Sequence, residues 1–335
     1  MLTLKIRKIY RAIFILGIIA FGLSEIHVFD VLRIIAGTGF MLSFGLPYIE
    51  LIAAKIKMNS LEKMVFAIAM SLLLIYPAGV INIFIEGKEN IYVQHLSGIL
   101  FIMLVIFSFG ILLNKILKVR SDNLEMEKRE IWMLLPVILL GLVFRVINLG
   151  EANLNGDEID MGAAIYDLVD GMVAGRNAYF ISQTGHSPLG FFISHAFYNL
   201  LEPGGFYLMK DWMFRAPQVL MGVLVMFGTY LITKKLTQTR WISLLAASLI
   251  AVDSYSNFAS RLAIFQDLST FAFFTLVFLL AMIMFLEMKN KTTAILLGVS
   301  FGTLLLVKFT GILFLPLFLL PIILCKKEWK KIFLS

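Results

Sequence analysis

Two adjacent carboxylates, Asp157 and Glu158, follow Asn155-Gly156 shortly after a long apolar run. They can start a helix, because Asn155 fits the N-cap position, Glu158 completes a capping box, and acids are favoured at a helix N-terminus. They can equally do chemistry, since a carboxylate at a membrane–water boundary can act as a general base whose proton affinity follows local burial and charge. From these residues alone the two interpretations stay open.

Four cationic side chains lie near the ends of apolar runs: Arg145, Arg215, Arg261 and Lys308. Any one of them can snorkel, with its aliphatic stem in lipid and its charge at the headgroups. Several cations near outer membrane ends run against the inside bias of basic residues and predict an anionic ligand, for which phosphate is the natural candidate. Asp267, six residues after Arg261, fits either an ion pair with that arginine or a wall of the same polar site.

The sequence offers little support for a cofactor. His186 alone, ahead of Ser187-Pro188, predicts a structural residue, and the four histidines are scattered. The chain has no HExxH, CxxC, EF-hand, Walker A or GxGxxG pattern, which argues against ATP, NAD and a histidine-based metal centre. A divalent metal held by carboxylates outside the membrane stays open.

The composition indicates which elements must position these residues. Of the 335 residues, 60% are hydrophobic and 15% are charged, and the mean hydropathy is +0.90. This predicts an all-α membrane protein, a polytopic helical bundle, because a soluble domain would be more polar and a membrane barrel would show short alternating segments. Ten spans fit, at roughly 9–24, 31–54, 63–85, 93–117, 131–148, 214–233, 241–257, 267–286, 292–307 and 309–325.

The basic residues predict the orientation of these spans. The net charge of +7 comes from short clusters at the ends of apolar runs, so we exclude nucleic acid as a partner. The positive-inside rule places the connectors 55–63, 115–129 and 234–240 in the cytoplasm and the segment 149–213 outside. We therefore expect an integral protein of the cell (plasma) membrane with its site on the extracytoplasmic side.

The outer loop 149–213 holds eight acids against two bases. Apolar residues recur from 160 to 176 at i, i+3 and i+4 spacing, which predicts an amphipathic helix lying on the membrane surface. Ser187-Pro188 suits the start of a second helix over 187–202, which reads as interfacial because a further span there would move 234–240 outside. We thus expect two juxtamembrane surface helices in this loop.

The order of the motifs resembles a known family. The motifs are GDEID (156–160), HSPLGFF (186–192), FRAPQVLMGVLVMFGTYLI (214–232), SRLAIFQDLSTF (260–271) and LGVSFGTLLLVKFTGILFLP (297–316). They resemble the polyprenyl-phosphate-sugar-dependent glycosyltransferases of the integral-membrane C superfamily, which include protein O-mannosyltransferases and lipid A aminoarabinose transferases. The resemblance covers about residues 131–325 and implies a glycosyltransferase-like membrane core. The family usually continues with further spans, so a C-terminally incomplete fragment, a split protein and a minimal form of the family all stay open. Residues 1–120 then form an additional four-span unit.

The resemblance also implies roles for single residues. Asp157 matches the catalytic base that opens the first outer loop, and Glu158 matches its acidic neighbour. His186 and Asp267 match supporting residues, although Ser187 stands where the family usually has a proline. The residues that match cations of the family, and that would bind the donor phosphate, are Arg215, Arg261 and Lys308.

The implied function is transfer of a sugar from a polyprenyl-phosphate donor to an acceptor hydroxyl, with inversion, on the outer face of the membrane. The acceptor is a protein or a glycolipid. The alternatives are a polytopic transporter or non-catalytic lipid-handling scaffold, and a degenerate paralogue without activity. A transporter is expected to carry ionisable residues near the bilayer midplane, whereas those here gather at the outer boundary, which favours the enzyme.

Overall fold

A computed structural model of the chain describes residues 2–24, 30–86, 96–119, 124–159, 162, 165, 188–203, 208–263 and 269–325. These residues are helical apart from short connections and one pair of three-residue strands. The prediction of an all-α fold is confirmed in this part of the chain. Apolar side chains are exposed along several helices, as expected where a helix faces lipid.

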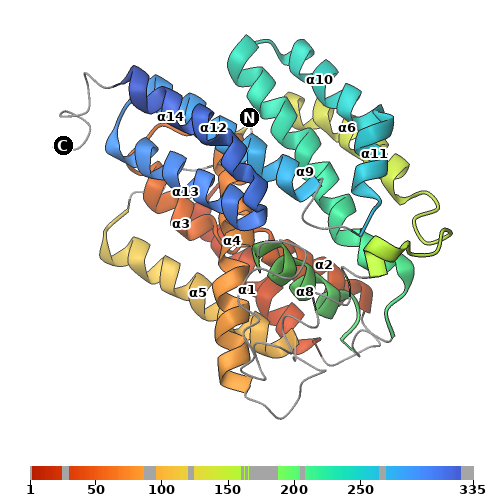
Figure 1. Cartoon of the computed structure of the whole chain (residues 1–335). Helices are drawn as coiled ribbons and strands as arrows, with labels where there is room; N and C mark the ends of the chain where they lie inside the picture. The colour runs from red at the N-terminus through yellow and green to blue at the C-terminus, as the bar shows by residue number, and fades with distance from the viewer. Residues whose placement is uncertain are drawn as a thin grey trace.

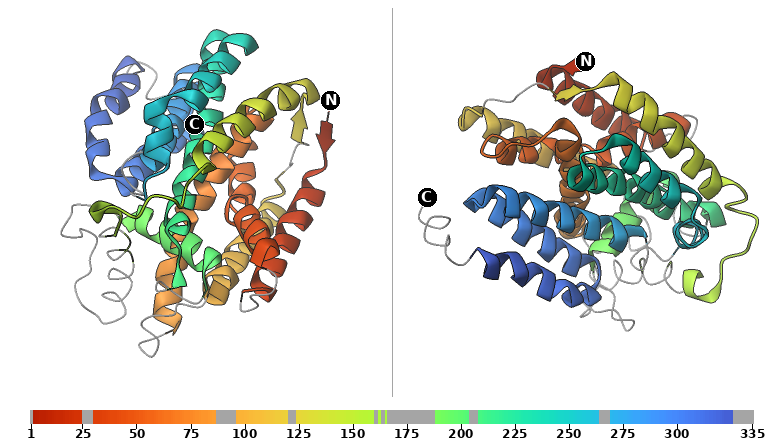
Figure 2. Two further views of the ribbon diagram at one scale, coloured as in Figure 1. Left: turned by 90° about the vertical axis from the view of Figure 1, so that its right-hand side faces the viewer. Right: turned by 90° about the horizontal axis from the view of Figure 1, so that it is seen from above.

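The first group of helices lies at the lower left and centre of Figure 1. It comprises α1 (Ile6–Gly22), α2 (Asp30–Met41), α3 (Leu46–Ala53), α4 (Ser60–Glu86) and α5 (Leu96–Ile116). Strand β1 (Leu2–Leu4) precedes it and pairs antiparallel with β2 (Leu124–Met126), as the left view of Figure 2 shows. The start of the chain is thereby attached to the segment that leads into the second group.

The second group follows β2. It comprises α6 (Lys128–Val146), α8 (Pro188–Leu201), α9 (Asp211–Thr237), α10 (Arg240–Val252), α11 (Ser254–Ser260), α12 (Ser269–Met288), α13 (Lys291–Val307), the 3-10 helix η4 (Phe309–Phe314) and α14 (Leu315–Leu324). Helix α9 packs along α10 and α12, and α12 packs along α13. Helices α10 and α11 are bent by 61° at Asp253.

Each of the ten predicted spans coincides with a helix or a helix pair, but fewer have the length and composition of a span. Five helices within the described residues are long and apolar enough to cross a membrane: Asp30–Ala53, Ser60–Asn82, Leu96–Ile116, Asp211–Thr237 and Ser269–Met288. The bent pair of α10 and α11 would be a sixth. These helices support an integral membrane protein, while the count of ten spans is not confirmed.

Helix α8 differs most from its prediction. It was expected to lie on the membrane surface, yet its side chains are buried among other helices, with Ile193 and Tyr198 fully enclosed. It packs against α2, α4 and α5 of the first group and against α9 and α13 of the second. The predicted interfacial helix is therefore not confirmed for this segment, because protein covers the apolar surface that lipid was expected to cover. The other predicted surface helix lies outside the described residues, except for Gly162 and Ile165.

Arg33 of α2 anchors α8 to the first group. Its side chain is 1% exposed; its Nε donates to the carbonyl oxygen of Leu200 at 3.1 Å, and its Nη2 donates to that of Leu201 at 3.3 Å. Asp30, one turn earlier, forms an ion pair with its Nη1 at 2.7 Å. The last carbonyls of a helix lack partners within that helix, so this arginine supplies the donors that α8 needs at its buried end.

Replacing Arg33 with Met should lower the stability of the whole protein by about 1–3 kcal/mol, because two buried carbonyls lose their donors. Thermal unfolding of the purified protein in detergent measures this change. The matched control is Lys8→Met on α1, whose side chain is exposed and which should shift stability by no more than about 0.5 kcal/mol. Equal effects of the two variants would contradict an anchoring role of Arg33.

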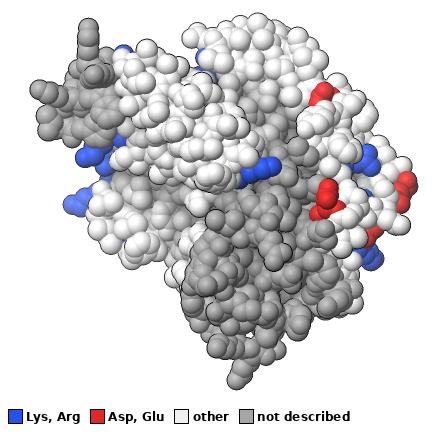
Figure 3. Space-filling model, viewed as in Figure 1, with Lys and Arg blue, Asp and Glu red and all other residues white. Residues whose placement is uncertain are grey.

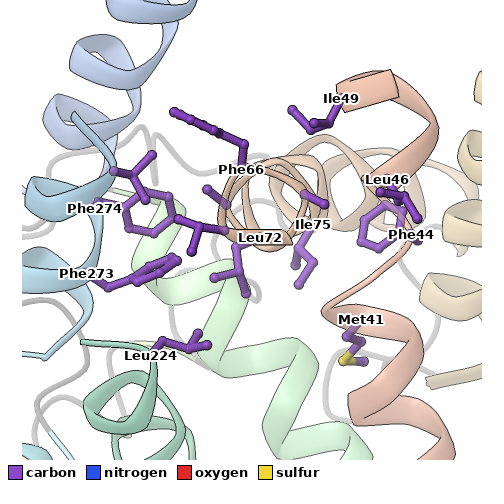
Figure 4. Packing of buried hydrophobic residues seen from close by; sticks show 14 of the residues in the cluster. Met41, Phe44, Leu46, Ile49, Phe66, Leu72, Ile75, Leu224, Phe273 and Phe274 are labelled. Atoms are coloured by element: carbon purple, nitrogen blue, oxygen red, sulfur yellow. The ribbon is translucent and has the colours of Figure 1, made fainter. Parts of the chain in front are cut away.

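The two groups share a hydrophobic core. Leu72 of α4 lies on the side of Phe273 and Phe274 of α12 within it (Figure 4). Ile75 lies on the other side of α4, toward Met41 and Phe44. The same cluster of buried residues extends into α1, α5, α8 and α9. The first group is thus packed into the same core as the helices that carry the motifs, and it contributes to their positions.

Candidate active site

Asp157 and Glu158 lie in the first turn of a short helix that follows the segment after α6. Asn155 Oδ1 accepts from the backbone N–H of Glu158 at 2.9 Å, and Glu158 Oε2 accepts from the backbone N–H of Asn155 at 3.0 Å. These reciprocal bonds form a capping box, as the spacing predicted. The two acids differ in environment, because Glu158 is 1% exposed while Asp157 is exposed.

Arg215 of α9 binds Glu158 through two parallel hydrogen bonds. Its Nε donates to Glu158 Oε1 and its Nη2 donates to Glu158 Oε2, both at 2.8 Å. The backbone N–H of Ala263, beyond α11, also donates to Glu158 Oε1 at 2.8 Å. We call these interactions of Glu158 and Arg215 the clamp. It joins three parts of the chain: the segment after α6, the start of α9 and the segment after α11.

The remaining donors of Arg215 are also engaged. Its Nη1 donates to the carbonyl oxygens of Leu149 and Ala152 at 2.8 Å, and its Nη2 donates to that of Asn153 at 3.2 Å. A guanidinium has five N–H donors, and all five have acceptors here. The geometry therefore argues against the predicted phosphate contact of Arg215. Glu158 is likewise committed, since each of its oxygens accepts two hydrogen bonds, and this argues against its use as a base.

The clamp keeps Glu158 ionised. Burial would by itself raise the pKa of the Glu158 carboxyl, but the hydrogen bonds from Arg215 and from the backbone N–H groups of Asn155 and Ala263 hold its pKa below the ordinary value of 4.5. An ionised carboxylate paired bidentately with arginine is a strong and directional contact. Asp157 is thus attached to a residue whose position is fixed.

Arg261 ends α11 and is tied to the same segment. Its Nη2 donates to the carbonyl oxygen of Asn148 at 3.1 Å, which leaves other guanidinium donors for a ligand. Ala263, two residues later, is the residue whose N–H binds Glu158. The structure therefore brings Asp157, Arg215 and Arg261 to one segment, residues 148–158.

The other predicted site residues are placed separately. Lys308 lies between α13 and η4 and is half-buried, and the contacts that join Asp157, Arg215 and Arg261 do not include it. His186 and Asp267 lie outside the described residues. Within the described part of the chain, no three His, Cys, Asp or Glu side chains are grouped so that they could hold a metal ion.

Arg145 has a structural role that the sequence did not reveal. Its side chain is fully buried at the bend between α10 and α11. Its Nη1 donates to the carbonyl of Ala251 at 3.4 Å, and its Nη2 donates to that of Ile250 at 3.3 Å and to Ser256 Oγ at 2.9 Å. A bend frees carbonyl groups from their helical partners, and buried carbonyls need other donors. Arg145 supplies them and so supports the helix that ends at Arg261.

Gly222 of α9 lies against this bend. A Cβ atom at position 222 would be 2.6 Å from Ser260 Cβ and 2.7 Å from Arg145 Nε. Contacts this short require Arg145 or the end of α11 to move. A glycine at position 222 therefore allows α9 to approach both.

Gly222→Ala should therefore destabilise the protein by about 1–3 kcal/mol and lower its activity, because the added methyl group displaces Ser260, which precedes Arg261. The matched control is Gly298→Ala in α13, where the added Cβ meets nothing within 4 Å and should stabilise the helix by about 0.5–1 kcal/mol. Unfolding in detergent measures both variants. A Gly222→Ala protein as stable and active as the unmodified one would contradict a tight contact at this bend.

The acidic residues are unevenly distributed on one face of the molecule. On the face shown in Figure 3, the acidic residues lie on the side of α10, α11 and the segment after α6. Lys and Arg occur on both sides of this view.

An exposed carboxylate that follows directly on an arginine-bound segment, carried by a bundle with several apolar helices, fits the class of membrane enzymes that act on lipid-linked anionic substrates. Residues 185–335 match the family model of dolichyl-phosphate-mannose-protein mannosyltransferases. The match covers somewhat less than half of the chain, includes Arg215, Arg261 and Lys308, and begins after Asp157. It confirms the resemblance and supports a C-superfamily glycosyltransferase. Searches of the curated proteins and of the solved structures gave no match.

Proposed function

We propose that the protein transfers a sugar from a polyprenyl-phosphate donor to an acceptor hydroxyl of a protein or glycolipid, with Asp157 as the general base. The family match supports a glycosyltransferase of the mannosyltransferase type. The observation that carries the assignment of the base is the contrast between the two acids. Glu158 is buried and fully hydrogen-bonded, while its neighbour Asp157 is exposed and held in place by it.

In the proposed reaction, the Asp157 carboxylate accepts the proton of the acceptor hydroxyl. The acceptor oxygen forms a bond to the anomeric carbon of the sugar, and the bond from that carbon to the phosphate oxygen breaks. The electron pair leaves with the phosphate, so the second product is the polyprenyl phosphate. A single displacement of this kind inverts the configuration at the anomeric carbon.

The departing phosphate needs cations whose positions are fixed beforehand. Arg261 is the first candidate, because one contact to Asn148 orients it and leaves further donors. Lys308, between α13 and η4, is the second candidate. Preorganised donors near developing charge are among the largest contributions to enzymatic rates. Arg215 instead holds the segment that carries Asp157, and we assign it and Glu158 to positioning. The positive-inside rule places these residues on the outer side of the membrane.

The bent helix pair α10–α11 with its buried arginine is the feature that a transporter would share. In transporters, irregular backbone of this kind commonly binds the transported ion or substrate. Here the Nη groups of Arg145 already donate to carbonyls of Gly141, Ile250 and Ala251 and to Ser256. This bend is therefore stabilised internally, which favours the enzyme over the transporter.

The test is transfer of label from radiolabelled polyprenyl-phosphate mannose, and from other polyprenyl-phosphate sugars, in membranes that contain the protein. We expect labelled protein or glycolipid, one polyprenyl phosphate released per sugar transferred, and inverted configuration in the product. Movement of intact lipid-linked sugar between leaflets without cleavage would instead support the transporter.

A further inference from the structure

A groove between α1 and α5 is separate from the clamp and from the motifs. It has a volume of about 690 Å³. The residues that define it are Arg7, Tyr10, Arg11 and Phe14 of α1 and Asn114 and Lys115 of α5. We call it the α1–α5 groove.

One end of the groove is basic. Arg7, Arg11 and Lys115 line it and are exposed. Within the part of the chain that the structure describes, no acidic side chain forms an ion pair with any of the three. Three cations around one recess, none with an acidic partner among the described residues, favour binding of an anion.

The floor of the groove is polar and held in place. Asn114 Nδ2 donates to the Tyr10 hydroxyl at 3.3 Å and to the carbonyl oxygen of Pro47 at 2.9 Å. The ring of Tyr10 packs edge-on against Phe107, with 6.1 Å between centroids. The recess is therefore formed before a ligand arrives.

The other end of the groove is apolar and opens onto a surface suited to lipid. Phe14 lines it and is 40% exposed. Beyond it, α1 exposes Ile15 and Ile18, and α5, which is long and apolar enough to span a membrane, exposes Phe109 and Leu112. A ligand that fits both ends carries a negative headgroup and a long apolar chain.

We infer that the α1–α5 groove binds an anionic glycerophospholipid, with its phosphate among Arg7, Arg11 and Lys115 and its acyl chains along Phe14. Basic pockets between membrane helices on the cytoplasmic side bind anionic headgroups in this way. Free phosphate would leave the apolar end uncovered. The positive-inside rule places this end in the cytoplasm, on the opposite side from the proposed reaction. This site does not depend on the proposed function.

The experiment titrates phosphatidylglycerol and phosphatidylcholine into the purified full chain in detergent and counts bound lipid by native mass spectrometry. We expect preferential binding of phosphatidylglycerol. The double variant Arg7→Gln/Arg11→Gln should weaken that binding roughly 30-fold, about five-fold for each cation removed. The variant Arg7→Lys/Arg11→Lys keeps both charges and should retain most of the binding.

The matched control is Lys8→Gln/Lys118→Gln. It removes two exposed cations from the same ends of α1 and α5 that do not line the groove, and it should weaken binding about two-fold or less. Equal losses in the two Gln variants would overturn the site, as would equal binding of the two lipids. Displacement of phosphatidylglycerol by inorganic phosphate, or by polyprenyl phosphate at lower concentration, would overturn the assignment to a phospholipid. If the Arg7→Gln/Arg11→Gln protein does not fold, the single variant Lys115→Gln provides the test. Weaker binding of phosphatidylglycerol by this variant would support the site, and unchanged binding would contradict it.

Discussion

Asp157→Asn is expected to lower the rate of sugar transfer by about 10²- to 10⁴-fold, the usual contribution of a general base. Asparagine has the same shape as aspartate but is far less able to accept the hydroxyl proton. Since Asp157 is exposed, the change buries no new group and should leave the fold and the clamp intact. The rate constant kcat should fall while KM for the lipid-linked donor stays nearly the same, because the carboxylate acts on the acceptor.

The matched control is Glu151→Gln. Glu151 is an exposed acid on the same segment, before the clamp, and its replacement should leave the rate within about two-fold of the unmodified protein. Both variants should unfold at the same temperature. Full activity of the Asp157→Asn protein would rule out Asp157 as the general base. The clamp would then have only a stabilising role.

Breaking the clamp is expected to have the largest effect on stability. Glu158→Leu or Arg215→Met alone should cost about 3–5 kcal/mol, because each leaves a buried charge without its partner. The double variant should cost less than the sum of the two, by a coupling energy of about 2–3 kcal/mol. The double variant should still be less stable than the unmodified protein, because the carbonyl groups of Leu149, Ala152 and Asn153 lose the donors of Arg215.

A second Arg–Glu pair in the same protein provides the control. Arg240 Nη2 and Glu127 Oε2 lie 2.6 Å apart, but the two side chains are 37% and 48% exposed. The same double-mutant cycle on this pair should give a coupling of about 0–1 kcal/mol, because exposed ion pairs are screened by water. Similar coupling energies for the two pairs would show that burial does not strengthen the clamp.

The clamp also makes stability depend on pH. The pKa of Glu158 in the folded protein lies below the ordinary value of 4.5, so its contribution is fully present above about pH 4.5 and is lost as pH falls through the lowered pKa. The Glu158→Leu variant should lack this part of the acid dependence. If Glu158 and Arg215 position Asp157, the variants of the clamp that still fold should also lose kcat more than affinity for the donor.

The sequence predicted the local part of the site and not its long-range part. The capping box of Asn155 and Glu158 depends on residues three apart, so spacing alone was sufficient. The partner of Glu158 is 57 residues away, and no pattern along the chain pairs it with Arg215. Its position near an outer membrane end and the family resemblance instead predict a phosphate contact for Arg215, which would use the same donors that the structure commits to Glu158 and to backbone carbonyls.

For the fold, the sequence predicted the positions of the helices but not how they pack. Helix positions followed from apolar runs, since a run of about 20 apolar residues predicts a helix whether lipid or protein surrounds it. For the same reason the sequence could not decide what surrounds α8, because an apolar helix can be covered by lipid or by other helices. Only the contacts with α2, α4 and α13 decide between the two, and these involve residues far apart in the sequence.

The contact of Arg33 with α8 has a consequence for biosynthesis. Its carbonyl partner Leu200 is 167 residues further along the chain, which at 5–20 residues per second corresponds to roughly 10–30 s of translation. During this interval Arg33 of α2 lacks its acceptors on α8, the carbonyl oxygens of Leu200 and Leu201, because these residues have not yet been synthesised. Asp30, three residues before it on the same helix, is available from the start and neutralises it. Asp30 is thus a local partner for Arg33 during insertion, before α8 has been made, and it remains paired with Arg33 in the folded protein.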